Sequence, residues 1–171
     1  TNLLIQILIG PRQIGKTTAL VNITKQWGQQ TCVMASADDR QLEGTRWIEQ
    51  FWNEAHRKQG SNNTNVLLIL DEIQKIDNWS ETVKKLWDAD IRSGKKLKVI
   101  LSGSSSLAIQ TGLTESLAGR FEIIPATHIN WSEFKQLTNG TIDEFVFFGS
   151  YPCALQFYKD ESRWKSYILQ S

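Results

Sequence analysis

Two short segments of this chain carry side chains whose types and spacing suit phosphate chemistry. The first, Gly10–Thr17, reads GPRQIGKT and fits the G-x-x-x-x-G-K-[ST] pattern of a phosphate-binding loop. It follows the apolar run Leu3–Ile9 and precedes the helix-like run Thr17–Trp27. In that order a strand ends in a glycine-bearing turn, and the N–H groups of the turn and of the helix N-terminus face an anion. The residues predicted to bind nucleotide are Gly10, Pro11, Arg12, Gln13, Ile14, Gly15, Lys16, Thr17 and Thr18.

Within this loop, Lys16 and Thr17 have the most specific expected roles. A lysine at this position contacts the β- and γ-phosphates, and the hydroxyl that follows it binds Mg²⁺. The second segment is Asp71-Glu72, directly after the apolar run Val66–Leu70. A carboxylate at the end of a buried strand beside a phosphate loop holds Mg²⁺, so Asp71 is a predicted metal ligand. Glu72 is placed to act as general base on a water; the alternative is an acidic cap of the next segment.

Three further side chains follow or precede predicted strands. Ser102 and Ser104 lie at the end of the run Leu97–Ser102, where a hydroxyl can contact the γ-phosphate or the attacking water. A plain glycine–serine turn explains them equally well. Arg120, just before the predicted strand at Phe121, can stabilise charge on a transferred phosphoryl group across a subunit interface. A surface arginine near a strand start is the alternative.

Alternating strand and helix patterns predict the elements that position these residues. Apolar runs predict five strands, at 3–9, 31–36, 66–70, 97–102 and 121–124, the last interrupted at Pro125. Helical spacing predicts helices at 17–27, 45–59, from Asn78 or Ser80 to about 89, after Ser105, and at 131–137, 142–148, 152–158 and 162–171. The alternation predicts a three-layer α/β core with a mainly parallel five-stranded sheet over residues 1–129, followed by a helical segment at 130–171.

Composition narrows the class of protein further. The 171 residues carry a net charge of +1, which gives no global signal for binding nucleic acid or an anionic membrane. No apolar run approaches the roughly 20 residues of a membrane span. Cys32 and Cys153 are far apart, and two free thiols in the cytoplasm are the favoured interpretation. No Asn-Lys-x-Asp guanine-reading motif occurs, which favours adenine. Because the chain begins with Thr1 and ends in an amphipathic pattern, we expect a piece of a longer protein.

Taken together, these motifs resemble those of the AAA+ superfamily of P-loop NTPases, in particular prokaryotic AAA-type ATPases with a GPRQ-x-GKT loop and a poorly characterised C-terminal domain. The resemblance spans nearly the whole chain. It rests on Gly10–Thr18, Leu70–Lys75 with Trp79, Leu101–Ser105, Leu117–Phe121, Ile129–Phe134 and Phe148–Pro152. One departure is Cys153-Ala154, where an acidic residue is expected after the proline.

This resemblance implies an ASCE-type sheet, in which the strand carrying Ser102 lies between the two strands that end in the phosphate loop and in Asp71. It also implies ATP or ADP with Mg²⁺ as ligands and residues 130–171 as the beginning of a helical lid. Arg120 would be an arginine finger, a residue that stabilises charge on the phosphoryl group across a subunit interface. A homo-oligomer of the longer protein and a DNA or protein partner are expected, with no membrane association. Two functions remain open: an ATPase that drives conformational change, and a nucleotide-gated binding switch with negligible hydrolysis. A small-molecule kinase is disfavoured, because no acceptor-binding motif is apparent.

Overall fold

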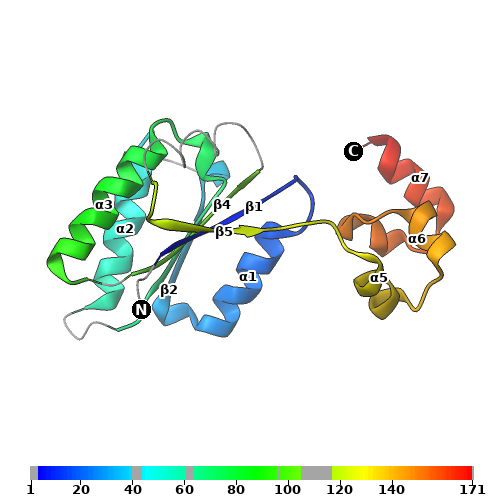
Figure 1. Ribbon diagram of the computed structural model, residues 1–171, viewed down its shortest axis with the longest axis horizontal. Coiled ribbons are helices and arrows are strands. Elements are labelled where there is room, and N and C mark those ends of the chain that lie inside the picture. Colours follow the sequence, from blue (N-terminus) through cyan, green and yellow to red (C-terminus); the bar gives the residue numbers. More distant parts are fainter. Residues whose placement is uncertain (1–3, 40–43, 61–63, 96, 105–116, 171) are drawn as a thin grey trace. The chain divides into compact units, whose positions relative to one another are not determined.

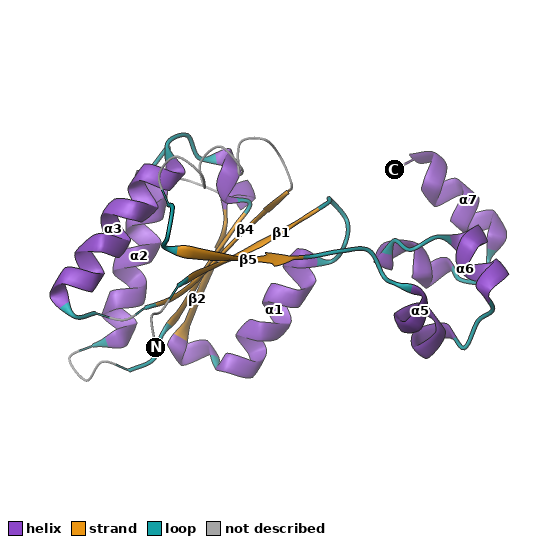
Figure 2. Ribbon diagram, in the orientation of Figure 1, coloured by secondary structure: helices purple, strands orange, loops and turns teal. Residues whose placement is uncertain are grey.

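The computed structural model describes residues 4–39, 44–60, 64–95, 97–104 and 117–170. The chain divides into two compact units, one of Thr1–Gly10 with Lys16–Pro125 and one of Pro11–Gly15 with Ala126–Ser171. Figures 1 and 2 show that the first unit contains the sheet and that helices dominate the second. The division after Pro125 lies near the predicted start of the helical segment at residue 130.

The sheet of the first unit has five described strands, and all of its pairings are parallel. They are β1 (Ile5–Gly10), β2 (Cys32–Ser36), β3 (Leu67–Asp71), β4 (Lys98–Ser104) and β5 (Phe121–Pro125). Their order is β2-β3-β4-β1-β5. This arrangement confirms the predicted parallel sheet, and it places β4 between β1 and β3 as the resemblance implied.

The register of the sheet gathers the candidate residues at one edge. Gly10 pairs with Ser104 across β1 and β4, and Ser36 pairs with Asp71 across β2 and β3. Because the strands are parallel, the carboxyl ends of β1, β3 and β4 meet at the same edge. In open α/β sheets this edge is where ligands bind.

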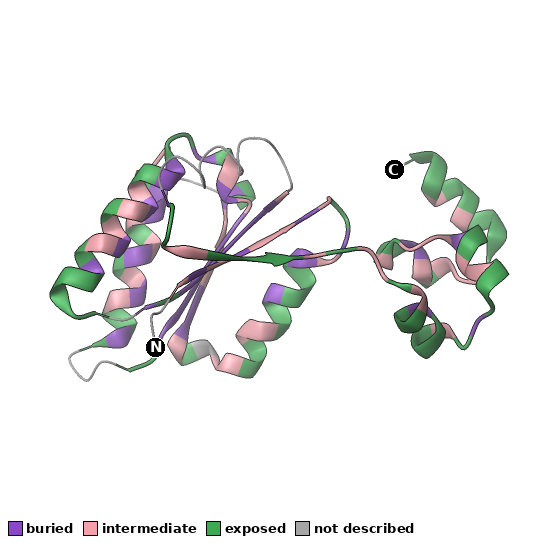
Figure 3. Ribbon diagram, viewed as in Figure 1, coloured by how far each residue is buried: buried purple, intermediate pink, exposed green. Residues whose placement is uncertain are grey.

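Helices cover both faces of the sheet (Figure 1). Helices α2 (Arg46–Gln59) and α3 (Trp79–Ser93) pack on one face, and α1 (Lys16–Trp27) packs on the other. Alternate residues of β3 point to opposite faces, since strand side chains alternate. Leu68 and Leu70 join the cluster under α2 and α3, whereas Leu67 and Ile69 join Leu20 of α1. All five residues of β3 are buried, as expected for a central strand, and Figure 3 shows the middle of the sheet as mostly buried.

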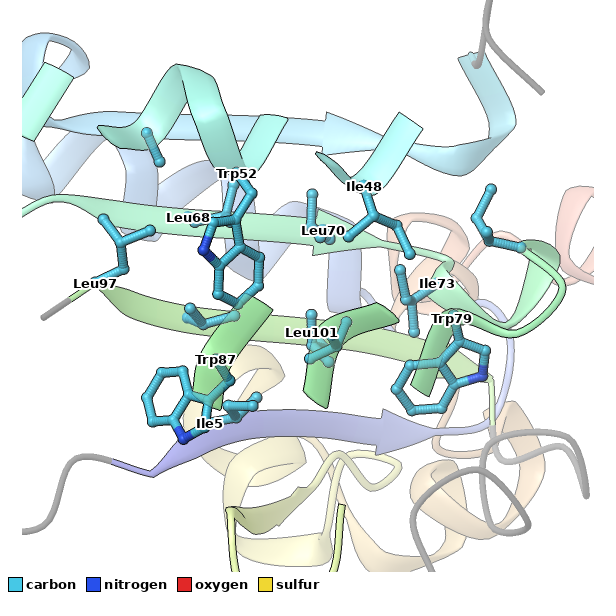
Figure 4. Packing of buried hydrophobic residues seen from close by; sticks show 14 of the residues in the cluster. Ile5, Ile48, Trp52, Leu68, Leu70, Ile73, Trp79, Trp87, Leu97 and Leu101 are labelled. Atoms are coloured by element: carbon cyan, nitrogen blue, oxygen red, sulfur yellow. The ribbon is translucent and has the colours of Figure 1, made fainter. Parts of the chain in front are cut away.

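Tryptophans fill much of the larger core cluster. Trp52 of α2 and Trp79 and Trp87 of α3 lie over the strands beside Leu68 and Leu101 (Figure 4). Trp52 is 1% exposed, and its indole N–H donates to Asp90 Oδ2 at 2.9 Å. The same carboxylate contacts His56 Nε2 at 2.9 Å. This polar link ties α2 to α3 beneath the apolar packing.

The described part of the first unit also contains three short 3₁₀ helices: η1 (Gln29–Thr31), η2 (Ala37–Asp39) and η3 (Ile73–Lys75). Helix α3 extends beyond the predicted end near residue 89 to Ser93, where Gly94 at φ 70° ends it. Of the two predicted starts, Asn78 and Ser80, Asn78 is the residue at the N-cap; it lies in the left-handed region at φ 56° and makes no side-chain cap hydrogen bond. The helix predicted after Ser105 lies outside the described residues.

The second unit is small and aromatic. Its helices are α5 (Trp131–Thr138), α6 (Ile142–Phe148) and α7 (Glu161–Gln170), with the 3₁₀ helix η4 (Pro152–Phe157) between the last two. The segment from Pro152, predicted as an α-helix, is therefore a 3₁₀ helix. Asn130 and Thr141 each form a reciprocal capping box with a glutamate three residues on, which fixes where α5 and α6 begin.

Aromatic rings make the core of this unit. Phe134, fully buried, contacts Phe145 and Tyr158 edge-on at 5.2 and 5.5 Å between ring centroids. Gly140 lies so close that an added Cβ would be 2.8 Å from the Phe134 ring, so only glycine fits there. None of the described helices of either unit is long and apolar enough to cross a membrane.

Candidate functional site

The phosphate loop joins β1 directly to α1, as predicted. Its backbone takes left-handed angles at Gln13 (φ 63°) and Gly15 (φ 84°). Such angles turn successive N–H groups toward one side and are unfavourable for most side chains, which explains the glycine. Helix α1 begins at Lys16 and has no acidic residue in its first turn. The positive end of its dipole is therefore not offset from within the helix and can face an anion.

Lys16 is buried, with 7% of its surface exposed, although a lysine normally keeps its charge in water. Its Nζ donates to the carbonyl oxygen of Gly10 at 2.8 Å. The side chain thus returns across its own loop, from the start of α1 to the end of β1. This contact joins the first residue of α1 to the last residue of β1.

Asp71 is the centre of the site. Only 1% of it is exposed, and it is the last residue of β3. Its Oδ2 accepts from Thr17 Oγ1 at 2.8 Å, and its Oδ1 accepts from the Ser102 hydroxyl and from the Glu72 N–H, the latter at 3.0 Å. One carboxylate therefore connects α1, β3 and β4. The structure brings together Thr17 and Asp71, the two predicted Mg²⁺ ligands.

The chemistry of this pair suits Mg²⁺. The ion prefers a few hard oxygen ligands and completes its coordination with water and nucleotide phosphates. Thr17 is exposed, and its hydroxyl lies 2.8 Å from Asp71 Oδ2, so the structure places one hydroxyl and one carboxylate oxygen side by side. Over the described residues, no group of three or more His, Cys, Asp or Glu side chains is arranged to hold a metal. A metal at Asp71 would therefore take most of its ligands from outside the protein.

Glu72 follows Asp71 with a left-handed backbone, at φ 53°. This conformation is uncommon for a non-glycine residue and is found most often at functional sites. The Glu72 side chain is half-buried, and its Oε2 accepts from Gln74 Nε2 at 2.6 Å. The same Gln74 nitrogen lies 3.3 Å from Ser104 Oγ. The predicted base is thus held by a neighbour two residues along the chain.

The structure separates the two candidate serines. Ser102 is fully buried, and its hydroxyl donates to Asp71, so it contacts the predicted metal ligand rather than open space. Ser104 is the last residue of β4, is half-buried and lies beside Gln74. Of the two, Ser104 has the position expected for a side chain that contacts the γ-phosphate. That role stays a prediction.

Arg120 contacts α3 of its own chain. Its Nε donates to Asp88 Oδ1 at 2.8 Å and its Nη2 donates to Asp88 Oδ2 at 3.0 Å, a two-pronged ion pair. The guanidinium lowers the pKa of Asp88, and the carboxylate raises the pKa of Arg120. The pair is one-third exposed. The structure does not bring Arg120 to Asp71 or Glu72, and its role as a finger stays a prediction.

Sequence reasoning missed Gln74, which contacts the predicted base, and Asp88, which pairs with Arg120 away from Asp71 and Glu72. Gln74 lies in the segment Leu70–Lys75, which is part of the family resemblance. Its contact with Glu72 depends on the 3₁₀ helix η3, and the spacing of apolar residues does not predict a helix this short. Asp88 lies in the middle of α3, where an acidic residue is ordinarily solvated. Only the packing of α3 against the start of β5 shows its partner.

Comparisons with known proteins agree with this geometry. The AAA domain family matches residues 3–135, and the chain belongs to that family. An uncharacterized protein of the archaeon Methanocaldococcus jannaschii is 27% identical, over 86% of this chain and 35% of that protein. The chain thus spans about a third of the relative's length.

Among solved structures, one from a study of katanin self-assembly matches with a TM-score of 0.52. It is 19% identical, and the match covers 82% of this chain and 45% of that one. At this identity the likeness shows the fold alone. Family and fold together define a nucleotide-binding, ATPase-like AAA domain.

Proposed function

We propose that this domain binds Mg²⁺-ATP, hydrolyses it to ADP, and couples the change of nucleotide to a conformational change in a longer protein. The observation that carries the proposal is Asp71, a buried carboxylate joined to Thr17 of the phosphate loop's helix and to Ser102 of the adjacent strand. A carboxylate buried at this cost is retained where it has a charged ligand to hold. Glu72, the next residue, then has the place of the base.

The protein groups divide the work of hydrolysis. Loop N–H groups and Lys16 bind the phosphates and stabilise charge that develops on them. Glu72 accepts a proton from the attacking water while the water oxygen bonds to the γ-phosphorus. The bond from that phosphorus to the β–γ bridging oxygen breaks, and the electron pair leaves with ADP. Thr17 and Asp71 would hold Mg²⁺, which would supply neutralisation of the phosphate charge when bound.

Two variants test this function. Lys16→Ala removes a charge-assisted contact of about 1.5–3 kcal/mol, so nucleotide affinity measured by calorimetry should fall about ten- to a hundredfold. Glu72→Gln keeps the shape of the side chain but removes the base. Binding should persist while turnover falls about a hundredfold or more. Unchanged affinity in the first variant would refute nucleotide binding at this loop, and equal turnover in the second would remove Glu72 from its role.

The second candidate function is a nucleotide-gated binding switch with negligible hydrolysis. It is favoured by the ion pair that already engages Arg120 with Asp88 of the same chain. Tight binding with no turnover above that of Glu72→Gln, for the longer protein as well as this chain, would support the switch.

The setting of the longer protein follows from the same proposal. We infer that it acts in the cytoplasm, in keeping with the free thiols of Cys32 and Cys153. We further propose that it assembles as a homo-oligomer, which places Arg120 of one copy at the nucleotide of the next. A DNA or protein partner would be bound through regions beyond this domain. Turnover measured with the longer protein, with and without DNA, distinguishes the partners.

A further inference from the structure

We propose that Gln74 is a positioning residue that fixes the carboxylate of Glu72 beside Ser104 for hydrolysis; the inference rests on the proposed role of Glu72 as base. Both hydrogens of one amide group are used. Gln74 Nε2 donates to Glu72 Oε2 at 2.6 Å and to Ser104 Oγ at 3.3 Å. A single side chain therefore joins the end of β3 to the end of β4, at the sheet edge where the nucleotide is expected.

The orientation of the amide follows from chemistry. An ionised carboxylate accepts hydrogen bonds and cannot donate them, so the nitrogen rather than the oxygen of Gln74 must face Glu72. A donor on one carboxylate oxygen leaves the other free to accept a proton from water. It also restricts rotation of the Glu72 side chain, which would otherwise sample several rotamers.

The backbone around Gln74 is held in place. Ile73 is fully buried and Ile76 is 1% exposed, and both belong to the core cluster under α2 and α3. The hydrogen bond from Ile76 N–H to Ile73 carbonyl oxygen, at 3.0 Å, closes the turn between them. Gln74 is therefore presented by an anchored turn, and its reach toward Glu72 does not depend on a flexible loop.

Packing alone does not explain a glutamine here. Its Oε1 is buried and has no hydrogen-bond partner among the described residues. Burying an unpaired acceptor is unfavourable, and an apolar side chain of the same length would fill the space without that cost. The buried amide oxygen of Gln74 lowers stability, and the neighbouring Glu72 has an unfavourable left-handed backbone. Such a combination is typical of a functional site.

The test compares Gln74→Met, Gln74→Glu and Glu72→Gln in single-turnover ATP hydrolysis, with calorimetry for nucleotide affinity. Gln74→Met keeps the length and loses both donors, so the chemical step should slow about 10- to 100-fold. Gln74→Glu keeps the oxygen but loses the donor and adds a like charge, and it should slow the step at least as much. Nucleotide Kd should stay within about twofold and the melting temperature should not fall, since a buried unpaired acceptor is removed in the first variant. Gln50→Met, at an exposed site on α2, is the matched control.

A double variant separates this inference from the proposed function. If Gln74 acts through Glu72, Glu72→Gln with Gln74→Met should be no slower than Glu72→Gln alone. A full additional loss in the double variant, or a Gln74→Met rate within about twofold of wild type, overturns the positioning role while Glu72 keeps its own. A Kd that rises in step with the lost rate also overturns it. If Glu72→Gln itself leaves turnover unchanged, both proposals fail together.

Discussion

Replacing Ser102 with alanine removes one hydrogen-bond donor from the carboxylate that joins the site. Ser102 is fully buried, so the variant changes little besides the hydroxyl. Asp71 keeps the donors of Thr17 and of the Glu72 N–H, at 2.8 and 3.0 Å. The substitution therefore measures how much the hydrogen bond from Ser102 of β4 contributes to the position of Asp71, the predicted metal ligand.

The magnitude follows from the partner's charge. A hydrogen bond to an ionised group contributes about 1.5–3 kcal/mol to stability. Because Asp71 retains two donors, we expect Ser102→Ala to lower the free energy of unfolding by about 1.5 kcal/mol, the lower end of that range. For a chain of this size that corresponds to a fall in melting temperature of about 3–6 °C. A carboxylate held by one donor fewer should also bind Mg²⁺-ATP about tenfold more weakly, a loss of about 1.4 kcal/mol.

Calorimetry with ATP, in Mg²⁺ and in a chelator, and urea unfolding followed by circular dichroism measure both effects. The tenfold loss should occur only with Mg²⁺, because Ser102 acts through Asp71 and not on the phosphates. Ser93→Ala is the control, since that exposed hydroxyl bonds only within the end of α3. If Ser102→Ala weakens binding equally without Mg²⁺, Ser102 contacts nucleotide directly. If the stability and the ATP affinity of Ser102→Ala both match those of the wild type, Ser102 does not help to hold Asp71 and is only a residue near the end of β4.

The remaining predictions concern two polar contacts of the first unit, Arg120 with Asp88 and Asp90 with Trp52 and His56. In the assembled longer protein, Arg120→Ala should cut turnover about a thousandfold with unchanged ATP affinity, and the specific activity of the variant should not rise with protein concentration. If specific activity depends neither on protein concentration nor on Arg120, then Arg120 only pairs with Asp88 of α3. The pKa of Asp88 lies below its ordinary value of 3.8, so its pair stabilises the fold above that pH and is lost as pH falls through the lowered value. The destabilisation by Asp88→Asn should therefore shrink as urea titrations are taken at successively lower pH below 3.8, and a constant difference would argue against the pair. Asp90→Ala leaves the buried Trp52 indole and the half-buried His56 ring without their shared acceptor, and it should lower the free energy of unfolding by about 3 kcal/mol; a loss below about 1 kcal/mol would show the network to be dispensable.

Local patterns were enough to predict most of the first unit. Continuous apolar runs such as Val66–Leu70 are typical of strands buried on both faces, and β3 lies where that run predicted, shifted by one residue. Gly28 follows the last residue of α1 with φ 101°, as expected of a residue that ends a helix. The position of the phosphate loop between a strand and a helix was predictable because the motif consists of consecutive residues in the chain. Less regular segments were predicted less well, as η4 and the end of α3 show.

The sequence by itself determined the chemical identity of the site: a phosphate loop with Lys16 and Thr17, and a strand ending in Asp71 and Glu72. Only the tertiary structure decided which of these side chains touch. The order of strands brings β4 beside β3, and this alone distinguishes Ser102, which donates to Asp71, from Ser104, which lies by Gln74. The physical reason is that spacing along the chain fixes which residues share a face or a turn. Contacts between strands and helices distant in sequence depend on how the whole core packs.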